Sequence, residues 1–353
     1  MTASAYGPMD VVCLGESMVT FLPTRAGRLA DVPSFVRGIG GAESNVACAL
    51  AAAGHRTRWV GRVGADGFGD HLVSAITAYG VDTSAVTRDP ERPTGVYFRT
   101  ATDRATDAHE VVYYRAGSAA SAMSPRTVPS DAVRSGRVLH LSGITAALSP
   151  DCLALMRDLT ARRDGGPLVS FDVNHRPGLW RDPSAADVLL ELARGADIVF
   201  VGEDEAEEAW GVRGADAIRA ALPEPSVVVV KRGAAGAVSF TRRPDPALGN
   251  DPGAGSDTVT TVPAPRVAVT APVGAGDAFA AGFLSATLRG LTARQRLRHG
   301  HLWAAAALTV PGDLAAPPAA GHADRLAALD DEAWGRLHLG PGWTGEDQEV
   351  RTP

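Results

Sequence analysis

The second half of the chain alternates between short apolar runs and amphipathic runs, and this alternation restricts the fold more than any other feature. The apolar runs read as buried strands at 138–144, 168–173, 198–201 and 227–230. The other runs read as helices at 150–163, 185–194, 217–222, 277–289 and 294–308. Strands that alternate with helices form a parallel sheet. The pattern therefore predicts an α/β fold whose sheet is covered by helices on both faces.

The first half follows the same rhythm until two strands occur with no helix between them. The regular part predicts a strand at 11–16 that continues through 19–22, a helix at 43–54, a strand at 58–63 and a helix at 70–79. The exception is a hairpin of strands 94–99 and 110–115, joined by the polar stretch 102–108. With 35–39, this hairpin predicts a small separate β-layer. We expect one domain over 1–340, with strands of the small layer from 16–40 and 94–116, and a disordered tail at 341–353.

A glycine-rich turn before the helix at 277–289 predicts an anion site. The run 272–279 reads Pro-Val-Gly-Ala-Gly-Asp-Ala-Phe. Gly274 and Gly276 can adopt backbone angles closed to other residues and leave N–H groups facing outward. Those donors and the positive end of the helix dipole attract an anion. An aspartate at this place, Asp277, fits a proton acceptor beside a phosphate.

The overall composition argues against several classes of protein. With a formal net charge of −6 and a pI near 5.9, the chain lacks the basic footprint of a nucleic-acid binder. No apolar run approaches the roughly 18 residues that span a bilayer. No secretory signal is visible at 1–10, and we expect a cytoplasmic protein. Cys13, Cys48 and Cys152 lie far apart and lack metal-ligand spacing.

Two further glycine-rich turns have competing interpretations. The run 40–45, Gly-Gly-Ala-Glu-Ser-Asn, fits a plain capped helix start and equally a turn that brings Asn45 to a polyhydroxylated ligand. The run 61–69 lies between a strand and a helix, but its spacing is not G-x-G-x-x-G, which disfavours a dinucleotide site. The sequence also has no Walker A loop, no histidine pair at i and i+4, and no G-x-S-x-G elbow.

Polar side chains follow three of the predicted strands, where ligands bind in open α/β sheets. Arg176 has a forked guanidinium that suits a carboxylate, although a surface salt bridge explains a single arginine as well. Lys231 is the only lysine in the sequence, and it can face phosphate or simply end a strand. The acidic run 203–205 can hold hydrated Mg²⁺ or form a solvated face.

In this order, the motifs resemble those of the PfkB (ribokinase-like) carbohydrate kinases. The early signature is Gly-Gly-Ala-Glu-Ser-Asn-Val-Ala at 40–47, and the late one is Gly-Ala-Gly-Asp-Ala-Phe-Ala-Ala-Gly-Phe at 274–283. The similarity runs from about 11 to 314. It implies a ribokinase-like α/β fold with a mostly parallel central sheet, helices on both faces and a small β-sheet lid. It also implies that the lid strands pair between subunits in a homo-oligomer.

Within that family, the chain looks most like the 2-keto-3-deoxygluconate kinases. Local matches at 94–97, 113–119, 140–145, 172–176 and 231–234 carry this resemblance. It implies ATP-dependent phosphorylation of the primary hydroxyl of a 2-keto-3-deoxy sugar acid, with ATP and Mg²⁺ as cofactors and Asp277 as catalytic base beside Gly274, Ala275 and Gly276. The implied sugar-acid contacts are Gly41, Asn45, Tyr97, Tyr113, Arg115, Ile144 and Arg176. The implied nucleotide contacts are Lys231, Gly233, Gly236 and Gly276, with Glu205 at the metal.

Two positions depart from the family pattern. Ala271 stands where relatives commonly have an aspartate that helps to hold a monovalent cation, and Gly202 stands where an asparagine of the Asn-x-x-Glu pattern is usual. Two other functions stay open. One is a kinase of the same fold for a neutral sugar or nucleoside such as fructose, ribose or adenosine, and the other is a non-catalytic sugar or nucleotide sensor.

Overall fold

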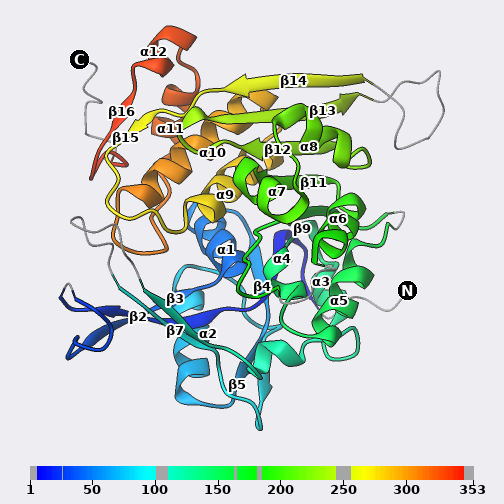
Figure 1. Ribbon diagram of the computed structural model, residues 1–353, viewed down its shortest axis with the longest axis vertical. Helices are drawn as coiled ribbons and strands as arrows, with labels where there is room; N and C mark the ends of the chain where they lie inside the picture. Colours follow the sequence, from blue (N-terminus) through cyan, green and yellow to red (C-terminus); the bar gives the residue numbers. More distant parts are fainter. Residues whose placement is uncertain are drawn as a thin grey trace.

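In a computed structural model, the protein is described at residues 6–25, 27–100, 110–162, 165–180, 185–243 and 256–345. Its main sheet has eight strands in the order β14-β13-β12-β11-β10-β9-β1-β4 (Figure 1). The strands from β12 to β4 are parallel to their neighbours, while β13 and β14 are antiparallel. Their bounds are β1 Met9–Leu14, β4 Thr57–Val60, β9 Gly136–Ser142, β10 Leu168–Asp172, β11 Ile198–Gly202, β12 Val227–Lys231, β13 Ala237–Arg243 and β14 Ser256–Val262.

Each central strand buries both faces, because successive side chains point to opposite sides of a sheet. Along β12, Val227 and Val229 join one apolar core, and Val228 and Val230 join the other. The first core lies under α1 Ala42–Ala52, α2 Gly67–Ala78, α9 Ala275–Leu288, α10 Ala293–Leu308, α11 Ala320–Ala327 and α12 Asp331–Gly335. The second lies under α3 Ser130–Val133, α4 Gly143–Ala146, α5 Pro150–Thr160, α6 Ala185–Gly195, α7 Glu203–Trp210 and α8 Ala215–Ala221. The predicted α/β fold, with a mostly parallel sheet between two helical layers, is confirmed.

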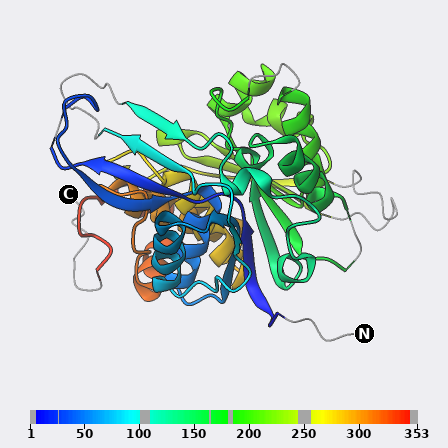
Figure 2. The same ribbon diagram turned by 90° about the horizontal axis from the view of Figure 1, so that it is seen from below.

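A second sheet of four strands, which we call the lid, has the order β3-β2-β7-β8. Its strands are β2 Met18–Pro23, β3 Phe35–Gly40, β7 Val96–Arg99 and β8 Val111–Tyr114. Phe21 and Phe98 stack across β2 and β7 with ring centroids 4.8 Å apart. Figure 2 shows these strands running together away from the helical body. Because β2 follows β1 directly and β3 leads into α1, the lid is tied to the main sheet at both ends.

Two apolar runs that we expected to be single strands are each divided between sheets. The run 11–22 forms β1 in the main sheet and β2 in the lid, with the turn 15–17 between them. The run 58–63 forms β4 and then β5 Arg62–Gly64, which pairs with β6 Thr87–Asp89. The strand expected at 138–144 ends at Ser142, and Ile144 lies in α4. An apolar pattern reports burial, and it does not show which sheet provides the hydrogen bonds.

The sequence pattern was also incomplete around the acidic run 203–205, around the expected loop 242–255 and near the C-terminus. Glu203, Asp204 and Glu205 form the first turn of α7, where acidic residues favour a helix N-terminus. The antiparallel pair β13 and β14 flanks the expected surface loop at 242–255, of which 244–255 lie outside the described residues. The polar stretch 102–108 of the expected hairpin also lies outside the described residues. Of the expected tail at 341–353, residues 346–353 also lie outside, and Trp343 is buried in the first core.

The remaining short elements are η1 Ala119–Ala122, η2 Gly233–Ala235, and the paired strands β15 Arg266–Val267 and β16 His338–Leu339. In the described part of the chain, no helix combines the length and the apolar character needed to cross a bilayer. The carboxyl ends of β1, β9, β10, β11 and β12 share one edge of the main sheet. Strand order reverses between β1 and β9, which is where open α/β sheets bind ligands.

Candidate active site

The predicted anion turn forms at the start of α9. Gly274 is the N-cap residue with a φ of 72°, and a Cβ atom there would overlap the backbone carbonyl of Asp313. Both the angle and the space therefore require glycine. Residues 275–277 follow as the first turn, whose N–H groups have no acceptor within a helix. A Cβ atom on Gly276 would lie 3.7 Å from the ammonium of Lys231, so a cation lies beside these donors.

Asp277 is half-buried in that same turn and is held by a neutral donor. The side-chain amide of Asn45 in α1 donates to its Oδ2 at 2.8 Å. Burial first, and then the nearby negative charge of Asp172, raise the pKa of Asp277, which lies at about 7. The positive charges of Lys231 and Arg176, with the Asn45 hydrogen bond, act in the opposite direction. The result is a carboxyl group that can gain or lose a proton near neutral pH.

Lys231 ends β12 and forms an ion pair with Asp172 at the end of β10. Its Nζ lies 3.0 Å from both carboxylate oxygens. Burial lowers the pKa of Lys231, but the charges of Asp172 and Glu205 outweigh burial and raise it overall. Glu205 accepts the N–H of Gly202 at 2.7 Å with one oxygen, and its other oxygen lies 3.5 Å from the guanidinium of Arg176. Three strand ends thus place two cations and two carboxylates beside the anion turn.

The early glycine turn approaches the lid very closely. A Cβ atom on Gly41, the N-cap residue of α1, would overlap the carbonyl oxygen of Glu16. Its φ of 178° is ordinary extended backbone, so space alone requires glycine here. A Cβ atom on Gly40 would overlap the hydroxyl of Tyr97 and lie 2.7 Å from a carboxylate oxygen of Asp313. Asn45 follows this glycine pair in the first turn of α1.

Arg115 and Tyr97, two of the predicted sugar-acid contacts, each have a carboxylate partner within the protein. Arg115 forms an ion pair with the buried Glu16, which also accepts the hydroxyl of Ser118 at 2.7 Å. The Tyr97 hydroxyl donates to Asp313. Burial, together with that carboxylate, raises the pKa of Tyr97 well above its ordinary value. The Tyr113 ring lies between the two, 5.4 Å from the Tyr97 ring and 5.6 Å from the Arg115 guanidinium.

Arg176 and Ile144 lie past the ends of β10 and β9. The Arg176 side chain is 52% exposed and donates to the backbone carbonyl of His175 at 2.8 Å. Before it, Asn174 is buried and adopts a left-handed φ of 42°, an angle that favours glycine and asparagine. Ile144 is held by Ser142, whose hydroxyl caps α4 by accepting the Ile144 N–H at 3.3 Å. The exposed guanidinium of Arg176 is therefore the cation most available to a ligand at this edge.

The two glycines predicted near the nucleotide differ in what they contact. Gly233 begins η2 with a φ of 52°, and no described atom lies within 4 Å of a Cβ placed on it. Gly236 has a φ of 110°, and a Cβ there would overlap the carbonyl of Val262. A glycine is thus required at position 236 because the neighbouring backbone at Val262 leaves no room for a Cβ atom. Among the described residues, no group of three histidine, cysteine or acidic side chains is arranged to hold a metal ion by itself.

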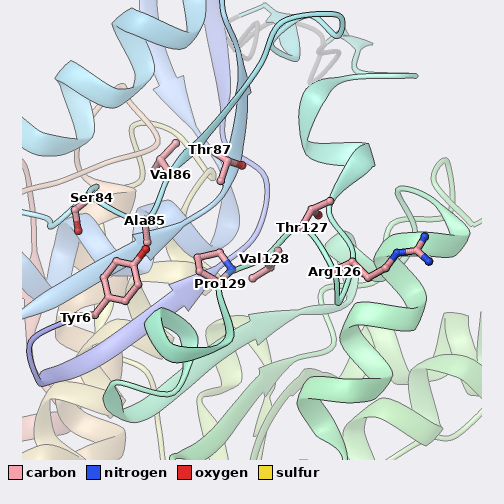
Figure 3. Close-up of a pocket in the computed structure, with 9 residues that line it drawn as sticks. All are labelled: Tyr6, Ser84, Ala85, Val86, Thr87, Arg126, Thr127, Val128 and Pro129. Carbon is pink, nitrogen blue, oxygen red and sulfur yellow. The ribbon is translucent and has the colours of Figure 1, made fainter. Parts of the chain in front are cut away.

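A separate hollow of about 260 Å³ lies outside this cluster (Figure 3). It is lined by Tyr6, residues 84–87 and residues 126–129. Arg126 extends away from the other labelled side chains in Figure 3. The guanidinium carbon of Arg58 lies over the Tyr6 ring, 4.8 Å from its centroid. None of the predicted site residues lines it, so we do not assign it to the candidate active site.

A comparison with protein families decides to which group this site belongs. The model of the pfkB family carbohydrate kinases matches residues 9–320, a range that contains both glycine turns and every strand end described above. The chain belongs to the pfkB family of carbohydrate kinases. This kinase is 34% identical over 315 residues to 2-dehydro-3-deoxygluconokinase of Bacillus subtilis, a match that covers 87% of the chain and 91% of the relative.

Other relatives and solved structures agree with the family. A 2-dehydro-3-deoxygluconokinase of Thermoproteus tenax is 33% identical, with 90% of this kinase and 94% of the relative covered. Fructokinase-1 of Oryza sativa is 31% identical, with 78% and 81% covered. A PfkB protein from Polaromonas superposes with a TM-score of 0.75 at 33% identity, covering 91% and 100%. A sugar kinase from Pyrococcus horikoshii in complex with ATP has a TM-score of 0.74 at 26% identity, covering 92% and 99%.

Several residues at this edge were not predicted as site residues. They are Glu16, Glu43, Asp172 and Asp313. Glu16 and Asp172 follow strand ends, so the rule that located Arg176 and Lys231 could have found them. Glu43 and Asp313 gave no local signal, because their partners lie about a hundred residues or more away in the chain.

Glu43 is a buried carboxyl group that joins α1 to the end of β9. Its Oε1 accepts the hydroxyls of Ser142 and Thr145, each at 2.8 Å. It packs directly against Gly15, where a Cβ atom would overlap the carboxyl group. Burial raises the pKa of Glu43 from 4.5 to about 7, and the two hydroxyls only partly offset this. Ser142 donates its hydroxyl to Glu43 and accepts the N–H of Ile144, so Glu43 helps to hold the turn that contains Ile144.

We predict that Glu43→Gln changes how stability depends on pH. Between pH 4.5 and about 7 the folded protein keeps the Glu43 proton while the unfolded chain releases it, so stability decreases as the pH rises through this window. This loss amounts to at most about 3 kcal/mol, from about 1.4 kcal/mol per pH unit. The variant should lack it. Urea unfolding at pH 5, 6, 7 and 8 measures the difference.

The exposed Glu332→Gln provides the control, because that side chain is 82% exposed and its substitution should leave the pH dependence unchanged. Parallel curves of unfolding free energy against pH for wild type and Glu43→Gln would contradict the prediction.

Proposed function

We propose that this kinase transfers the γ-phosphate of ATP to the primary hydroxyl of 2-dehydro-3-deoxygluconate. The observation that carries the proposal is that Asp277, half-buried and held by Asn45, lies in the same helical turn as the outward N–H groups of residues 275–277. A proton acceptor and an anion-binding turn are the two elements that phosphoryl transfer to a hydroxyl requires. The ATP complex of the Pyrococcus sugar kinase supports ATP as the donor.

Asp277 acts as the general base in this mechanism. It accepts the proton of the attacking hydroxyl as the oxygen approaches the γ-phosphorus. A base works best when its pKa lies close to the working pH, and the pKa of Asp277 near 7 meets that condition. The Asn45 amide donates to Oδ2 of Asp277, so Oδ1 is the oxygen that would accept the proton.

The anion turn and Lys231 stabilise the charge that develops on the phosphoryl group. Backbone N–H groups at a helix start are rigid, and they need no reorganisation during the reaction. The Lys231 ammonium is held at 3.0 Å from Asp172. Positioning and electrostatics of this kind account for most of the catalysis in phosphoryl transfer.

The donor set at the strand ends fits Mg²⁺ bound together with a nucleotide. Mg²⁺ usually takes one or two protein carboxylates and completes its shell with phosphate oxygens and water. Asp172 and Glu205, whose charges both act on Lys231, are the carboxylates that would hold it. When bound, the ion would neutralise charge on the phosphates. Gly202 has no side chain to add to this set, which leaves Glu205 without the usual asparagine neighbour.

The acid group of the substrate is assigned to Arg176. Arg115 is already neutralised by the buried Glu16, whereas Arg176 is half exposed and its carboxylate neighbour lies at the longer distance of 3.5 Å. A guanidinium binds a carboxylate through two parallel hydrogen bonds. The relatives from Bacillus and Thermoproteus, both named 2-dehydro-3-deoxygluconokinases, support an acidic substrate.

A neutral hexose such as fructose is the second candidate substrate. The Glu16–Arg115 pair favours it, because a neutralised arginine and a carboxylate together suit sugar hydroxyls better than an acid group. The fructokinase relative supports the same reading at 31% identity.

We also propose that the lid joins two copies of the chain. Strand β8 forms the edge of the lid, and its side chains Val111, Val112, Tyr113 and Tyr114 are all at least 36% exposed. An uncovered apolar edge strand is a surface for pairing with another chain. A cytoplasmic location is proposed as well, because Cys13, Cys48 and Cys152 are all unpaired thiols.

We predict that Asp277→Asn lowers kcat by at least about 100-fold with little change in KM, because it removes the base and keeps the shape. In the wild type, kcat/KM should rise with pH through about 7 as Asp277 loses its proton. Asp172→Asn should move that rise to lower pH, since the negative charge that raises the pKa of Asp277 is removed. Coupled assays of ADP release from pH 5.5 to 8.5 measure both effects.

The exposed Asp216→Asn is the control for the pH profile and should leave the midpoint in place. Near-normal kcat in Asp277→Asn would exclude Asp277 as the base.

We predict that Arg176→Gln discriminates between the two candidate substrates. For a keto-deoxy sugar acid, loss of a charge-assisted contact should raise KM by about 10-fold or more. For fructose or ribose, KM should change little. Arg115→Gln is the comparison, and it should impair every substrate because it leaves Glu16 buried without its cation. Equal effects of Arg176→Gln on acidic and neutral sugars would refute the assignment.

We predict that Tyr114→Glu weakens self-association through the lid, because it places a charge in the centre of an apolar contact. Tyr114 is 64% exposed in the single chain. Light scattering after size-exclusion chromatography should show a dimer or larger assembly for the wild type and a shift toward monomer for the variant. Val259→Glu, on β14 at the edge of the main sheet, should behave like the wild type. A monomeric wild type would rule out the lid interface.

A further inference from the structure

Asp313 connects the lid to the anion turn, and the proposed mechanism has not used it. It lies in the segment that follows α10. Its carboxylate accepts the hydroxyl of Tyr97 and, at 2.7 Å, the guanidinium of Arg99. Both donors belong to lid strand β7, more than two hundred residues earlier in the chain. The Arg99 and Asp313 side chains are 8% and 5% exposed, so the pair is shielded from water.

The backbone of the same residue packs on the anion turn. A Cβ atom on Gly274 would overlap the carbonyl oxygen of Asp313 and would lie 3.0 Å from its carbonyl carbon. The segment before the turn is tied to the end of α10 by the Thr270 N–H, which donates to Leu308 at 2.7 Å, and by the Thr270 hydroxyl, which donates to Thr309 at 3.3 Å. The Asp313 carbonyl and Gly274 are therefore in close backbone contact.

The third contact of Asp313 is with the early glycine turn. A Cβ atom on Gly40 would lie 2.7 Å from a carboxylate oxygen of Asp313. Gly40 precedes α1, which carries Asn45, the residue that holds the catalytic carboxylate. Asp313 thus packs against lid strands β7 and β3 through its carboxylate and against the start of α9 through its backbone carbonyl. Packed interiors transmit strain, so a displacement at one of these contacts acts on the others.

We propose that Asp313 is a positioning residue that couples closure of the lid over the sugar to the arrangement of the anion turn. A sugar bound against β7 fixes Tyr97 and Arg99, these fix the Asp313 carboxylate, and the Asp313 carbonyl then sets Gly274 and the N–H groups that follow it. Tyr97 acts here through its hydroxyl as a link to Asp313. The inference rests on the proposed kinase function and adds to it a route by which the sugar prepares the site for phosphate.

The matched test compares Asp313→Asn with Asp257→Asn. Asp257 forms a similar pair with Arg219, at 2.6 Å and with side chains 19% and 7% exposed, on strand β14 away from the site. Asp313→Asn should lower kcat by about 100-fold, the cost of misplacing reacting groups by about 1 Å. Its KM values for ATP and sugar should change by less than about threefold, the pattern of an interaction realised only in the transition state. Asp257→Asn should lower the melting temperature but keep kcat.

A second readout does not depend on turnover. Hydrogen exchange of the segment 270–279 should slow when the sugar binds to the wild type without ATP, and this response should be absent in Asp313→Asn. Tyr97→Phe removes one hydroxyl and keeps the packing, so it carries the test if Asp313→Asn does not fold. It should reduce kcat and weaken the exchange response. Combined with Asp313→Asn, it should add little, because the two act through one link.

Normal kcat in both variants, a rise in KM alone, or an unchanged exchange response in both variants would overturn the coupling. The sugar used is the one that the wild type phosphorylates. If that is fructose and not 2-dehydro-3-deoxygluconate, the proposed substrate fails while the comparison of Asp313 variants still decides the coupling.

Discussion

The hydrogen bond between Asn45 and Asp277 is the interaction on which the rest of the site depends. It joins the first turns of two helices that are 232 residues apart in sequence. Each turn needs glycine for its own surroundings, since a Cβ atom on Gly41 would overlap the carbonyl oxygen of Glu16 and one on Gly274 would overlap the carbonyl oxygen of Asp313. Burial between the helices removes water from the carboxylate, and a neutral amide replaces only part of that hydration. This is why the pKa of Asp277 lies near 7.

Other buried carboxylates at this edge have cations as partners. Asp172 is paired with Lys231, Glu16 with Arg115, and Asp313 with Arg99. Asp277 and Glu43 are instead held by amide or hydroxyl donors, and both have a pKa of about 7. The two carboxyl groups whose pKa lies near 7 are thus the ones held by neutral donors.

Much of the fold and of the site could be predicted because its signals are local. A glycine turn that opens a helix needs only adjacent residues, and both such turns were found at their correct positions. Polar residues after strands were located by the rule that parallel strands end at one edge. The division of 11–22 between two sheets was missed, because alternation of apolar residues is the same in either sheet. The helix α7 was missed because its first turn is acidic and only Ala206 is buried in it.

By itself, the sequence determined the α/β architecture, the anion turn and the carboxylate within it. These follow from the backbone freedom of glycine and from the periods of helices and strands, which are properties of neighbouring residues. Only the tertiary structure decided which charged groups remain available to a ligand. Arg115 and Arg176 look alike in sequence, yet one is neutralised by Glu16 and the other is half exposed. Asp313 likewise has no significance until folding brings Tyr97 and Arg99 to it, because an ion pair depends on distance in space and not along the chain.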